Sequence, residues 1–492
     1  MGTGIIRRLL SAGLACMLGS ACYAVRAETV QAVQEPTCTA SGYRITTDPA
    51  RGVSTVENLP AVGHDWPDWT TDAAAGVQRR ICAACGYEEQ VRISSIPMES
   101  IAALYLTGSL EGVGKKQKVT LEAEFRSPEQ SFACYGVMTM QGHSTFGYLK
   151  HNYTLRLYND AREQVKYKVQ FGTGRKEHKY ILKANYLDLS QCRNLAGARI
   201  WRSMTACREG LHPRIAALPT LGAVEGFPVM VYLNGGLHGL YTMNLHKDGD
   251  LYGMREGERA ALVICNRETS PEALFRAPAV FDEDARSDWE IEFCGTKNDA
   301  WVRQSFNGLI DFVMTASDGD FRDQIRRRLD VDAAVDYLIL IYALGLPHSG
   351  AKDLVMLSYG DVWMPSAYDM DQAFGLDAES GRYLSPEEFL PQKTDGVWSS
   401  GTGSLLWDRL LNAFEKEVCA RYAELRGHVL SRENLLRCVE EFVSGIPETC
   451  YDLDANLYPN RPLNDRNMQG QITTYITRRL EALDAALEVN VP

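Results

Sequence analysis

The sequence has little positive charge, no second long apolar run and no regular cysteine framework, and each shortage excludes a class of protein. Lysine and arginine total 51 against 63 aspartates and glutamates, which gives a net charge of −12. So acidic a chain is not expected to carry a nucleic-acid-binding surface, and we expect no nucleic acid among its partners. Beyond the N-terminal segment, no run reaches the roughly 20 uninterrupted apolar residues of a membrane-spanning helix, so we expect no transmembrane segment.

The cysteines do not form the framework of a disulfide-rich protein. Without Cys16 and Cys22 of the N-terminal segment, 11 of the 13 cysteines remain, and their spacing is irregular. Most stand singly in apolar or helical patterns, where a buried free thiol is the commoner state. Only Cys82 and Cys85 have a paired spacing. They could bind zinc with His64, but the sequence shows no clear fourth ligand, so a local disulfide or a degenerate repeat is an equal alternative.

The first 27 residues predict a secretory signal peptide. Arg7 and Arg8 precede an apolar run from Leu9 to Val25, and small residues stand at the −3 and −1 positions of a cleavage site after Ala27. The run is short for a membrane span. Cleavage three residues earlier is an alternative, and lipidation of a cysteine is the minority alternative. We therefore expect a mature protein that is secreted or held at the cell surface.

Residues 28–96 form a separate segment with its own pattern. Three stretches stand out in it, Pro36–Tyr43, Leu59–Trp66 and Arg80–Glu88. Together they resemble small Ala-Thr-Cys…Gly…Cys-x-x-Cys-Gly repeats that occur with Gly-His-x-Trp linkers in secreted proteins. In those repeats a further cysteine pair precedes the Gly-His, and here that pair is missing. We expect this small Cys-containing segment to act as a spacer or in surface display.

The chain from residue 97 onward predicts a β-rich part followed by a mostly helical part. Val119–Phe125 alternates strictly between apolar and polar residues, as a half-buried strand does. Asn234-Gly235 between two apolar runs is the strongest short hairpin signal. The expected strands are 119–125, 132–140, 152–158, 165–171, 180–184, 228–233 and 238–243. The expected helices are 188–207, 300–314, 332–344, 404–412, 415–430, 432–444 and 467–489. The fold class is therefore α+β.

Asp369 and Asp371 lie where the β-rich and helical parts meet. They follow two apolar runs, 354–357 and 362–364, that predict a tight hairpin. On an extended segment residues i and i+2 point the same way, so both carboxylates can face one cation. Hard oxygen ligands suit Mg²⁺ or Mn²⁺. A solvated Asp-rich turn is the usual alternative, but the strands before the pair and Phe374 after it favour a buried rim.

Six segments, in order along residues 100–490, carry a resemblance to a known family. They are Met140–Thr145 with Lys150 and 152–157, 182–190 with Arg193 and Asn194, 239–244 with Lys247 and Asp248, 336–339, 363–371, and Phe374 with Gly375. This ordered set resembles the CotH kinase-like family, an atypical secreted relative of the protein kinases. The resemblance implies a two-lobed kinase-like domain over residues 97–492 that phosphorylates Ser or Thr of exported or surface proteins, using ATP.

The resemblance also implies which residues bind ATP and one or two divalent ions. Phosphoryl transfer needs donors around the phosphates, a Lys or Arg on the α/β-phosphates and acidic metal ligands. Asp369 corresponds to the metal-binding Asp of the family, with Asp371 beside it. The candidate phosphate-binding residues are Gly142 and Ser144 in a covering turn and the cations Lys150, Arg156 and Lys183. The alternatives are a plain hairpin turn at 142–144 and lysines that are merely solvated.

The run Gly345–Asp353 departs from the family pattern. Related sequences generally carry an acidic residue there, followed by Lys-Asn, which resembles the kinase catalytic loop. On a gapless match His348 stands at the position of the base-like Asp, and Asp353 at that of the metal-binding Asn. Histidine can accept a proton near neutral pH, and aspartate is a competent metal ligand.

Three functions remain open at this point. The first is a secreted CotH-like protein kinase in which His348 and Asp369 are catalytic and Asp353, Asp369 and Asp371 hold the metal. The second is a catalytically impaired member that acts as a scaffold at the cell surface or spore envelope, which the substitutions at His348 and Asp353 favour. The third is an adhesin, which ranks last because no aromatic sugar-binding stripe stands out.

Overall fold

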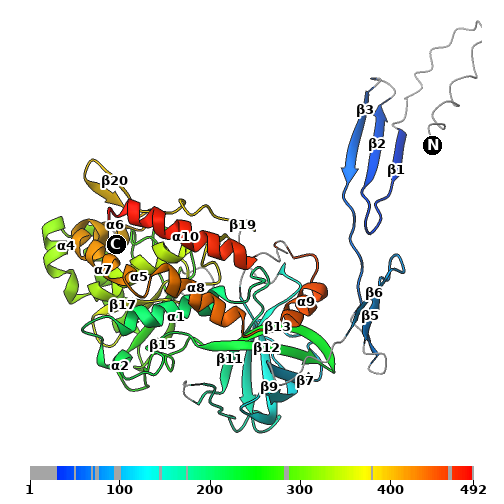
Figure 1. The fold of residues 1–492 in the computed structure, drawn as a ribbon, viewed down its shortest axis with the longest axis horizontal. Helices are drawn as coiled ribbons and strands as arrows, with labels where there is room; N and C mark the ends of the chain where they lie inside the picture. The colour runs from blue at the N-terminus through cyan, green and yellow to red at the C-terminus, as the bar shows by residue number, and fades with distance from the viewer. Residues whose placement is uncertain are drawn as a thin grey trace, which may run out of the picture. The chain divides into compact units, whose positions relative to one another are not determined.

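The computed structural model describes most of the chain beyond the N-terminal segment (Figure 1). The residues it describes are 30–48, 51, 53–67, 70–72, 77–92, 101–142, 147–172, 176–281, 288–377, 381–461, 463 and 468–489. The predicted signal peptide and the predicted domain boundary at residues 96 and 97 lie outside these ranges. Two compact units are present, one from residues 1–70 and 79–90 and the other from 71–78 and 91–492.

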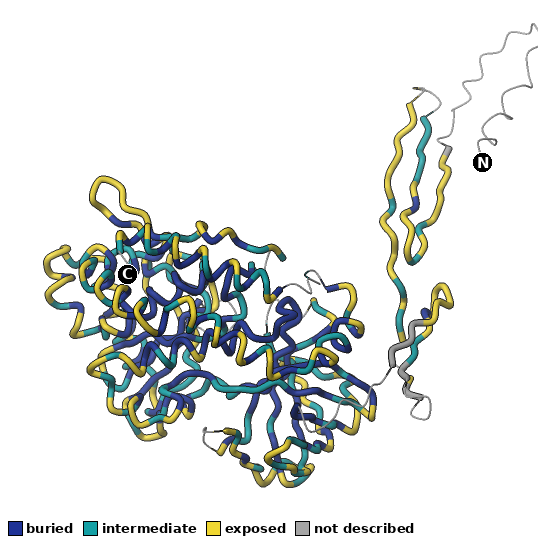
Figure 2. The backbone as a smooth tube through the Cα atoms, in the orientation of Figure 1, coloured by how far each residue is buried: buried dark blue, intermediate teal, exposed yellow. Residues whose placement is uncertain are grey.

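The described residues between 30 and 92 form two small sheets with almost no core. One sheet has the antiparallel order β1–β2–β3 and the other the order β4–β5–β6. Their strands are β1 (Val30–Gln34), β2 (Gly42–Asp48), β3 (Val53–Leu59), β4 (Thr70–Asp72), β5 (Val77–Ile81) and β6 (Glu88–Arg92). Among the residues of this region whose burial is described, only Gly42 and Cys82 are buried (Figure 2). The hydrophobic effect therefore contributes little to holding these sheets together.

The larger unit begins with a closed barrel. Its strand order is β10–β11–β13–β12–β7–β8–β9, with β7 and β12 parallel and the other pairs antiparallel. The strands are β7 (Ala102–Thr107), β8 (Val119–Arg126), β9 (Ser131–Gln141), β10 (Asn152–Tyr158), β11 (Lys179–Lys183), β12 (Gly226–Leu233) and β13 (Gly236–Leu245). Alternate residues of β8 (Leu121, Ala123 and Phe125) are buried in the barrel core, as the pattern of that strand predicts.

The hairpin predicted around Asn234-Gly235 is confirmed as β12–β13. Asn234 has φ 51° and Gly235 has φ 81°, so both turn residues adopt the left-handed conformation that a tight hairpin requires. The Asn234 amide also ties this turn to β7, since it accepts from the Gly108 N–H at 2.9 Å and donates to the Gly108 carbonyl at 2.7 Å. Asn234 therefore contributes twice: its backbone conformation forms the turn, and its side chain joins the turn to the end of β7.

The strand predicted over 165–171 is wrong. This segment makes only isolated bridges, Tyr158 to Lys166 and Val169 to Glu177. Its alternating apolar residues instead pack against the barrel core, where the Phe171 ring contacts the Phe125 ring at a centroid distance of 4.9 Å. Alternation of apolar and polar residues thus indicates that one face of a segment is buried. It does not distinguish a strand from an irregular segment that packs against a core.

The rest of the larger unit contains a four-stranded sheet, two two-stranded sheets and the helices (Figure 1). The antiparallel sheet has the order β15–β14–β16–β17, and its strands are β14 (Ala261–Cys265), β15 (Trp289–Cys294), β16 (Val355–Ser358) and β17 (Trp363–Ser366). The helices are α1 (Arg193–Ala206), α2 (Pro213–Ala216), α3 (Ala300–Thr315), α4 (Asp318–Gln324), α5 (Val331–Leu344), α6 (Leu405–Ala413), α7 (Glu415–Arg426), α8 (Arg432–Val443), α9 (Glu448–Leu457) and α10 (Met468–Ala486). This mixture of helix and sheet confirms the α+β class.

Helix α5 is the buried centre of this part. Every residue from Val331 to Leu344 except Asp332 is buried. The Asp330 side chain caps the first turn by accepting from the Ala333 N–H, and Gly345 ends the helix with φ 65°. No helix in the described part of the chain is long and apolar enough to cross a membrane.

Two predicted helix boundaries need correction. Helix α1 begins at Arg193, because the preceding residues form a turn in which the Gln191 N–H donates to the Asp188 carbonyl at 3.0 Å. Asp188 still serves the helix start, since its carboxylate accepts from the Arg193 N–H at 3.0 Å. Pro447, which lies between the expected helices 432–444 and 467–489, is the N-cap of α9, a helix that was not predicted, and a missing N–H costs no hydrogen bond at that position.

Candidate functional site

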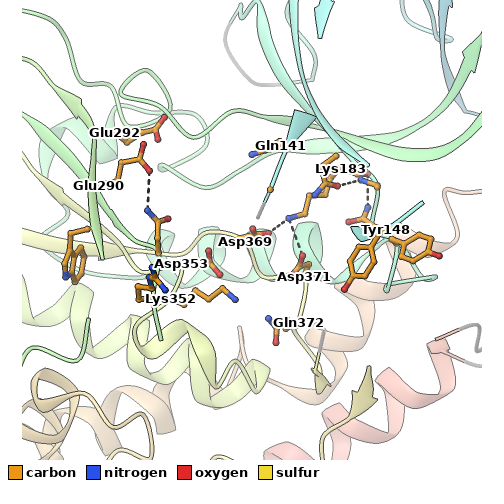
Figure 3. Close-up of a pocket in the computed structure, with 18 of the residues that line it drawn as sticks. Gln141, Tyr148, Lys183, Glu290, Glu292, Lys352, Asp353, Asp369, Asp371 and Gln372 are labelled. Atoms are coloured by element: carbon orange, nitrogen blue, oxygen red, sulfur yellow. Dashed lines mark hydrogen bonds and ion pairs between the residues drawn. The ribbon is translucent and has the colours of Figure 1, made fainter. Parts of the chain in front are cut away.

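A cavity of about 1370 Å³ lies between the barrel and the sheet that contains β14 to β17 (Figure 3). The barrel contributes Gln141 and Lys183, and the other wall contributes Glu290, Asp353 and Asp369. Small-molecule pockets usually have roughly 300–1,000 Å³, so this cavity can hold a ligand of nucleotide size. Charged side chains stand on both walls among apolar ones such as Trp289 and Phe293, and the charged side chains suit a charged ligand.

Lys183 joins the two walls of the cavity. It is the last residue of β11, and its ammonium donates to the Asp369 carboxylate and lies 3.3 Å from Asp371 Oδ2 (Figure 3). The Lys183 side chain is 10% exposed, and those of Asp369 and Asp371 are 27% and 34% exposed. Burial lowers the pKa of Lys183, but the two carboxylates outweigh burial and raise that pKa above its ordinary value.

The loop after β17 brings Asp369 and Asp371 to the same ammonium. The expected extended geometry is absent, because β17 ends at Ser366 and Asp369 has φ 50°. The Met370 N–H donates to the Asn194 side chain of α1 at 3.2 Å, which fixes the loop between the two aspartates. The two carboxylates therefore converge because neighbouring elements hold the loop, and the alternation of an extended strand plays no part.

Arginine 193 holds the far end of the same loop. Its guanidinium donates to the Ala373 carbonyl at 2.5 Å and to the Phe374 carbonyl at 3.0 Å, and the Phe374 N–H donates to the Leu344 carbonyl at 2.7 Å. The Arg193 side chain is itself buried and lies 3.2 Å from Asp188. These bonds run from α1 and α5, so the position of the acidic loop depends on the helical core.

Asp353 supplies a third carboxylate at the cavity. It immediately precedes Leu354 and β16, has φ 63°, and its N–H donates to the Cys265 carbonyl at 2.9 Å. Burial, followed by the nearby Asp369 and Asp371 charges, raises the pKa of Asp353 to about 8. Burial also raises the pKa of Asp371 to about 6, although Lys183 opposes that rise. Burial is thus the main cause of both shifts, and the neighbouring carboxylates add to it.

Three carboxylates around one ammonium fit a divalent cation chemically. Oxygen ligands of this kind are those that Mg²⁺ and Mn²⁺ prefer. Among the described residues, however, the oxygens of Asp353, Asp369 and Asp371 do not converge into a ready cage, and the Lys183 ammonium contacts two of them. In this conformation the Lys183 ammonium is thus the cation that the Asp369 and Asp371 carboxylates contact.

The other predicted phosphate-binding residues lie in different surroundings. Gly142, with φ 102°, lines the cavity, and Ser144 lies outside the described residues. Arg156 of β10 donates to Thr139 Oγ1 at 3.5 Å and is not among the described residues that line the cavity. Lys150 is in the wall, but its side chain has no exposed surface. The structure therefore brings Lys183, and not Arg156, to the carboxylates.

The Lys150 ammonium belongs to a buried cluster of charged residues with Asp454 and Arg461. It lies 2.8 Å from Asp454 Oδ1 of α9 and also donates to the Leu240 carbonyl. Arg461 lies 2.9 Å from the other oxygen of Asp454. Burial lowers the pKa of Lys150 to about 8, and Asp454 only partly opposes this shift. The pattern around Asp454, more than 300 residues from Lys150, gave no signal from which the pair could have been predicted.

His348 is held by a glutamate that the sequence analysis did not identify. Its Nδ1 lies 2.7 Å from Glu268 Oε1, and Lys352 Nζ lies 3.2 Å from the same oxygen. His348 opens a short 3₁₀ turn, His348–Gly350, and is not among the described residues that line the cavity. With Nδ1 paired to Glu268, Nε2 is the nitrogen left to accept a proton. The catalytic role of His348 stays a prediction.

Comparison with known proteins adds one finding. A family model described as CotH kinase protein matches residues 138–483, which are 346 of the 492 residues. The matched region contains Lys183, Asp353, Asp369 and Asp371 and extends from β9 to α10. A search of curated proteins finds no match.

Proposed function

The chain belongs to the CotH kinase family, and on that premise we propose that it is a secreted kinase that transfers the γ-phosphate of ATP to Ser or Thr of exported or surface proteins. The observation that carries this proposal is the convergence of Lys183, Asp369 and Asp371 from opposite walls of one cavity, with Asp353 nearby. A phosphate-binding cation and an acidic metal-binding group on facing walls are the parts that phosphoryl transfer requires. The proposed domain is the two-lobed kinase-like one.

The residues of the cavity would divide the work as follows. Lys183 would pair with the α/β-phosphate oxygens, and Asp369, Asp371 and Asp353 would hold the ion. A bound Mg²⁺ or Mn²⁺ would neutralise the charge that develops on the transferred group. Gly142 at the cavity wall has no side chain to obstruct a phosphate, and Ser144 belongs to the same proposed covering turn. Lys150 and Arg156 remain weaker proposals for phosphate contacts.

The transfer step needs a proton acceptor, and we assign it to His348. The acceptor hydroxyl oxygen bonds to the γ-phosphorus, the bond between that phosphorus and the β–γ bridging oxygen breaks, and ADP leaves. The hydroxyl proton passes to Nε2 of His348, while the Glu268 carboxylate at Nδ1 stabilises the imidazolium that forms. Neutral histidine is required at the start of this step.

The test compares Asp369→Asn with a matched aspartate elsewhere. Asp395 is exposed in the hairpin of β20 (Gln392–Thr394) and β21 (Val397–Ser399), and its φ of 51° matches the 50° of Asp369. Asparagine tolerates this backbone conformation at both sites. We expect magnesium- or manganese-dependent nucleotide binding and phosphorylation in wild type and in Asp395→Asn. Asp369→Asn should abolish phosphate incorporation. A folded wild-type protein without binding or transfer would overturn the proposal.

A non-catalytic scaffold at the cell surface or spore envelope is the second candidate. It is favoured by one observation, that His348 is bound to Glu268 and does not line the cavity. The scaffold function predicts nucleotide binding without transfer, or neither. Nucleotide binding without transfer would identify His348 and Asp353 as the lesions. The double substitution His348→Asp and Asp353→Asn should then restore transfer if these two residues alone are responsible.

A further inference from the structure

Four side chains of the small N-terminal unit meet at one point, and none of them belongs to the cavity. Cys38, His64, Cys82 and Cys85 place one potential ligand atom each within 4.8 Å of all the others. The Cys38 and Cys82 sulfurs are 3.8 Å apart, and the Cys85 sulfur is 3.3 Å from His64 Nδ1. From this geometry we propose that the four residues form a structural zinc site, with Cys38 as the fourth ligand that the sequence did not reveal.

The distances are those of a tetrahedral zinc ion. With Zn–S bonds of about 2.3 Å and Zn–N bonds of about 2.0–2.1 Å, tetrahedral angles place two sulfurs about 3.8 Å apart and a sulfur and a nitrogen about 3.6 Å apart. The spacing between the Cys38 and Cys82 sulfurs agrees with the first value, and that between Cys85 and His64 approaches the second. A disulfide needs about 2.05 Å between its sulfurs, far less than the 3.8 Å present.

Backbone hydrogen bonds bring the three ligand-bearing stretches together. The Gly63 N–H donates to the Cys38 carbonyl at 3.1 Å, and the Ala83 N–H donates to the Asp65 carbonyl at 2.8 Å. Within the last stretch, the Gly86 N–H donates to the Cys82 carbonyl at 2.9 Å, which closes a turn around the cysteine pair. These backbone hydrogen bonds, and not contacts between the ligand side chains, hold the three stretches together.

The aromatic residues beside the site orient His64. Its ring stacks on Tyr87 at a centroid distance of 5.3 Å and packs against Trp66 at 4.7 Å. The Arg80 guanidinium lies 4.5 Å from the centre of the Trp66 ring, so this side of the ring cluster is covered as well. Packing of this kind fixes the direction of Nδ1 and aims it at the cysteines.

The lack of a core supplies an independent reason for a metal. The strands of the first sheet are largely exposed, and Cys82 is the only buried apolar residue described before residue 101. Small domains without a sufficient core usually depend on disulfides or a structural metal. Four protein ligands leave no open position, so the ion would be structural and not catalytic. Binding would contribute folding free energy to this unit directly.

The experiment uses the full chain, purified under reducing conditions, and measures zinc per chain by elemental analysis. We expect one zinc per chain in wild type and in Cys207→Ser, a matched control that removes an exposed free thiol outside the group. Loss of a second-shell partner already weakens zinc affinity about 10–100-fold, so Cys38→Ser should weaken it by at least about 100-fold. Full zinc affinity in Cys38→Ser would overturn the assignment of the fourth ligand.

Cobalt titration of the wild-type chain decides the matter even if Cys38→Ser fails to fold. Three thiolates and one imidazole should give tetrahedral Co²⁺ absorption with sulfur-to-cobalt charge transfer, displaced by one equivalent of Zn²⁺. Chelation should increase proteolysis within residues 30–92 at least about tenfold and leave 101–489 resistant. Absence of zinc and of the cobalt spectrum in the reduced chain would overturn the proposal. A disulfide between these cysteines that forms again when the reduced chain is refolded with zinc present would overturn it too.

Discussion

Two lysines of the same barrel pair with aspartates far along the chain, yet the two groups differ in every other respect. Around Lys150, one carboxylate (Asp454) faces two cations, and neither Lys150 nor Asp454 has any exposed side-chain surface. Around Lys183, two contacting carboxylates and the nearby Asp353 face one ammonium at the wall of a cavity. The pairing of lysine with aspartate thus serves structure where the group is closed, and is available to a ligand where the group is open and acidic.

The Lys150 and Lys183 groups differ in whether a further ion can bind to them. The Lys150 group is surrounded by protein, with the Tyr241 ring centre 4.7 Å from its ammonium and the Leu240 N–H donating to Asp454 at 2.9 Å. Nothing can be added to it without disrupting packing. The Lys183 group keeps partly exposed carboxylates whose charge exceeds that of the one lysine they contact. An added cation would therefore stabilise the second group and could not enter the first.

The largest expected effect comes from removing the carboxylate of the closed group. Asp454→Asn leaves Lys150 and Arg461 buried without a counter-charge, so we expect a loss of roughly 3–5 kcal/mol in the free energy of unfolding. The same substitution at Asp371 removes one of three carboxylates from an open site and should change stability by less than about 1 kcal/mol. Denaturant unfolding of both variants measures the contrast. Equal losses would mean that both groups are structural.

The next largest effect is expected at the open Lys183 group, and it concerns phosphoryl transfer. Lys183→Met removes the proposed phosphate-binding cation, so we expect kcat/KM for phosphorylation to fall roughly 10²–10³-fold. Lys168→Met, at an exposed position in the irregular segment that packs against the barrel, serves as the control and should leave transfer unchanged. Activity measured over ATP concentration separates binding from chemistry. Transfer at the wild-type rate in Lys183→Met would exclude this lysine from the phosphate site.

The next effect depends on pH, and we expect it from Asp353 in buffer that contains a chelator. Its folded pKa is raised to about 8, whereas the unfolded carboxyl has a pKa of about 3.9. Between these values the folded state binds the extra proton, so this carboxyl makes the protein less stable as the pH rises from about 4 to 8. Asp353→Asn should flatten that decline and be more stable than wild type at pH 8.5. If the free energy of unfolding of the variant follows that of wild type from pH 5 to 8.5, the raised pKa of Asp353 is contradicted.

The smallest effect should follow Arg156→Gln. Arg156 makes one long hydrogen bond, to Thr139, and lies away from the cavity wall. We expect a change of less than about 0.5 kcal/mol in stability and less than about twofold in kcat/KM. A tenfold loss of transfer would instead place Arg156 on the phosphates and remove the contrast between it and Lys183.

The local features of this fold were predictable from the sequence, and the long-range ones were not. Strand β10 was predicted at its observed bounds, Asn152–Tyr158, and the hairpin at Asn234 was confirmed, because alternation and turn chemistry act over a few residues. Helix α9 was missed because a proline that begins a helix and one that interrupts a helix look alike in sequence. The pairing of Lys150 with Asp454 depends on how α9 packs on β13, which no local pattern encodes.

The candidate sites follow the same rule. The pairing of Asp369 with Asp371 was visible in the sequence because the residues are only two positions apart, although the reason for their convergence is the loop geometry. Cys38 could not be joined to Cys82 by spacing, because 44 residues separate them and the intervening strands fix the approach. Glu268 was missed because an isolated acidic residue in a loop has no pattern of its own.

Lys183 also has a thermodynamic consequence for the order of ligand binding. In this conformation its ammonium contacts the carboxylates that would receive a metal ion, so lysine and metal compete for the same oxygens. Phosphates that draw the ammonium away would relieve that competition. Nucleotide and metal should then raise each other's affinity by an equal factor, as linkage requires. The lysine would make the site respond to the pair of ligands and only weakly to free metal alone.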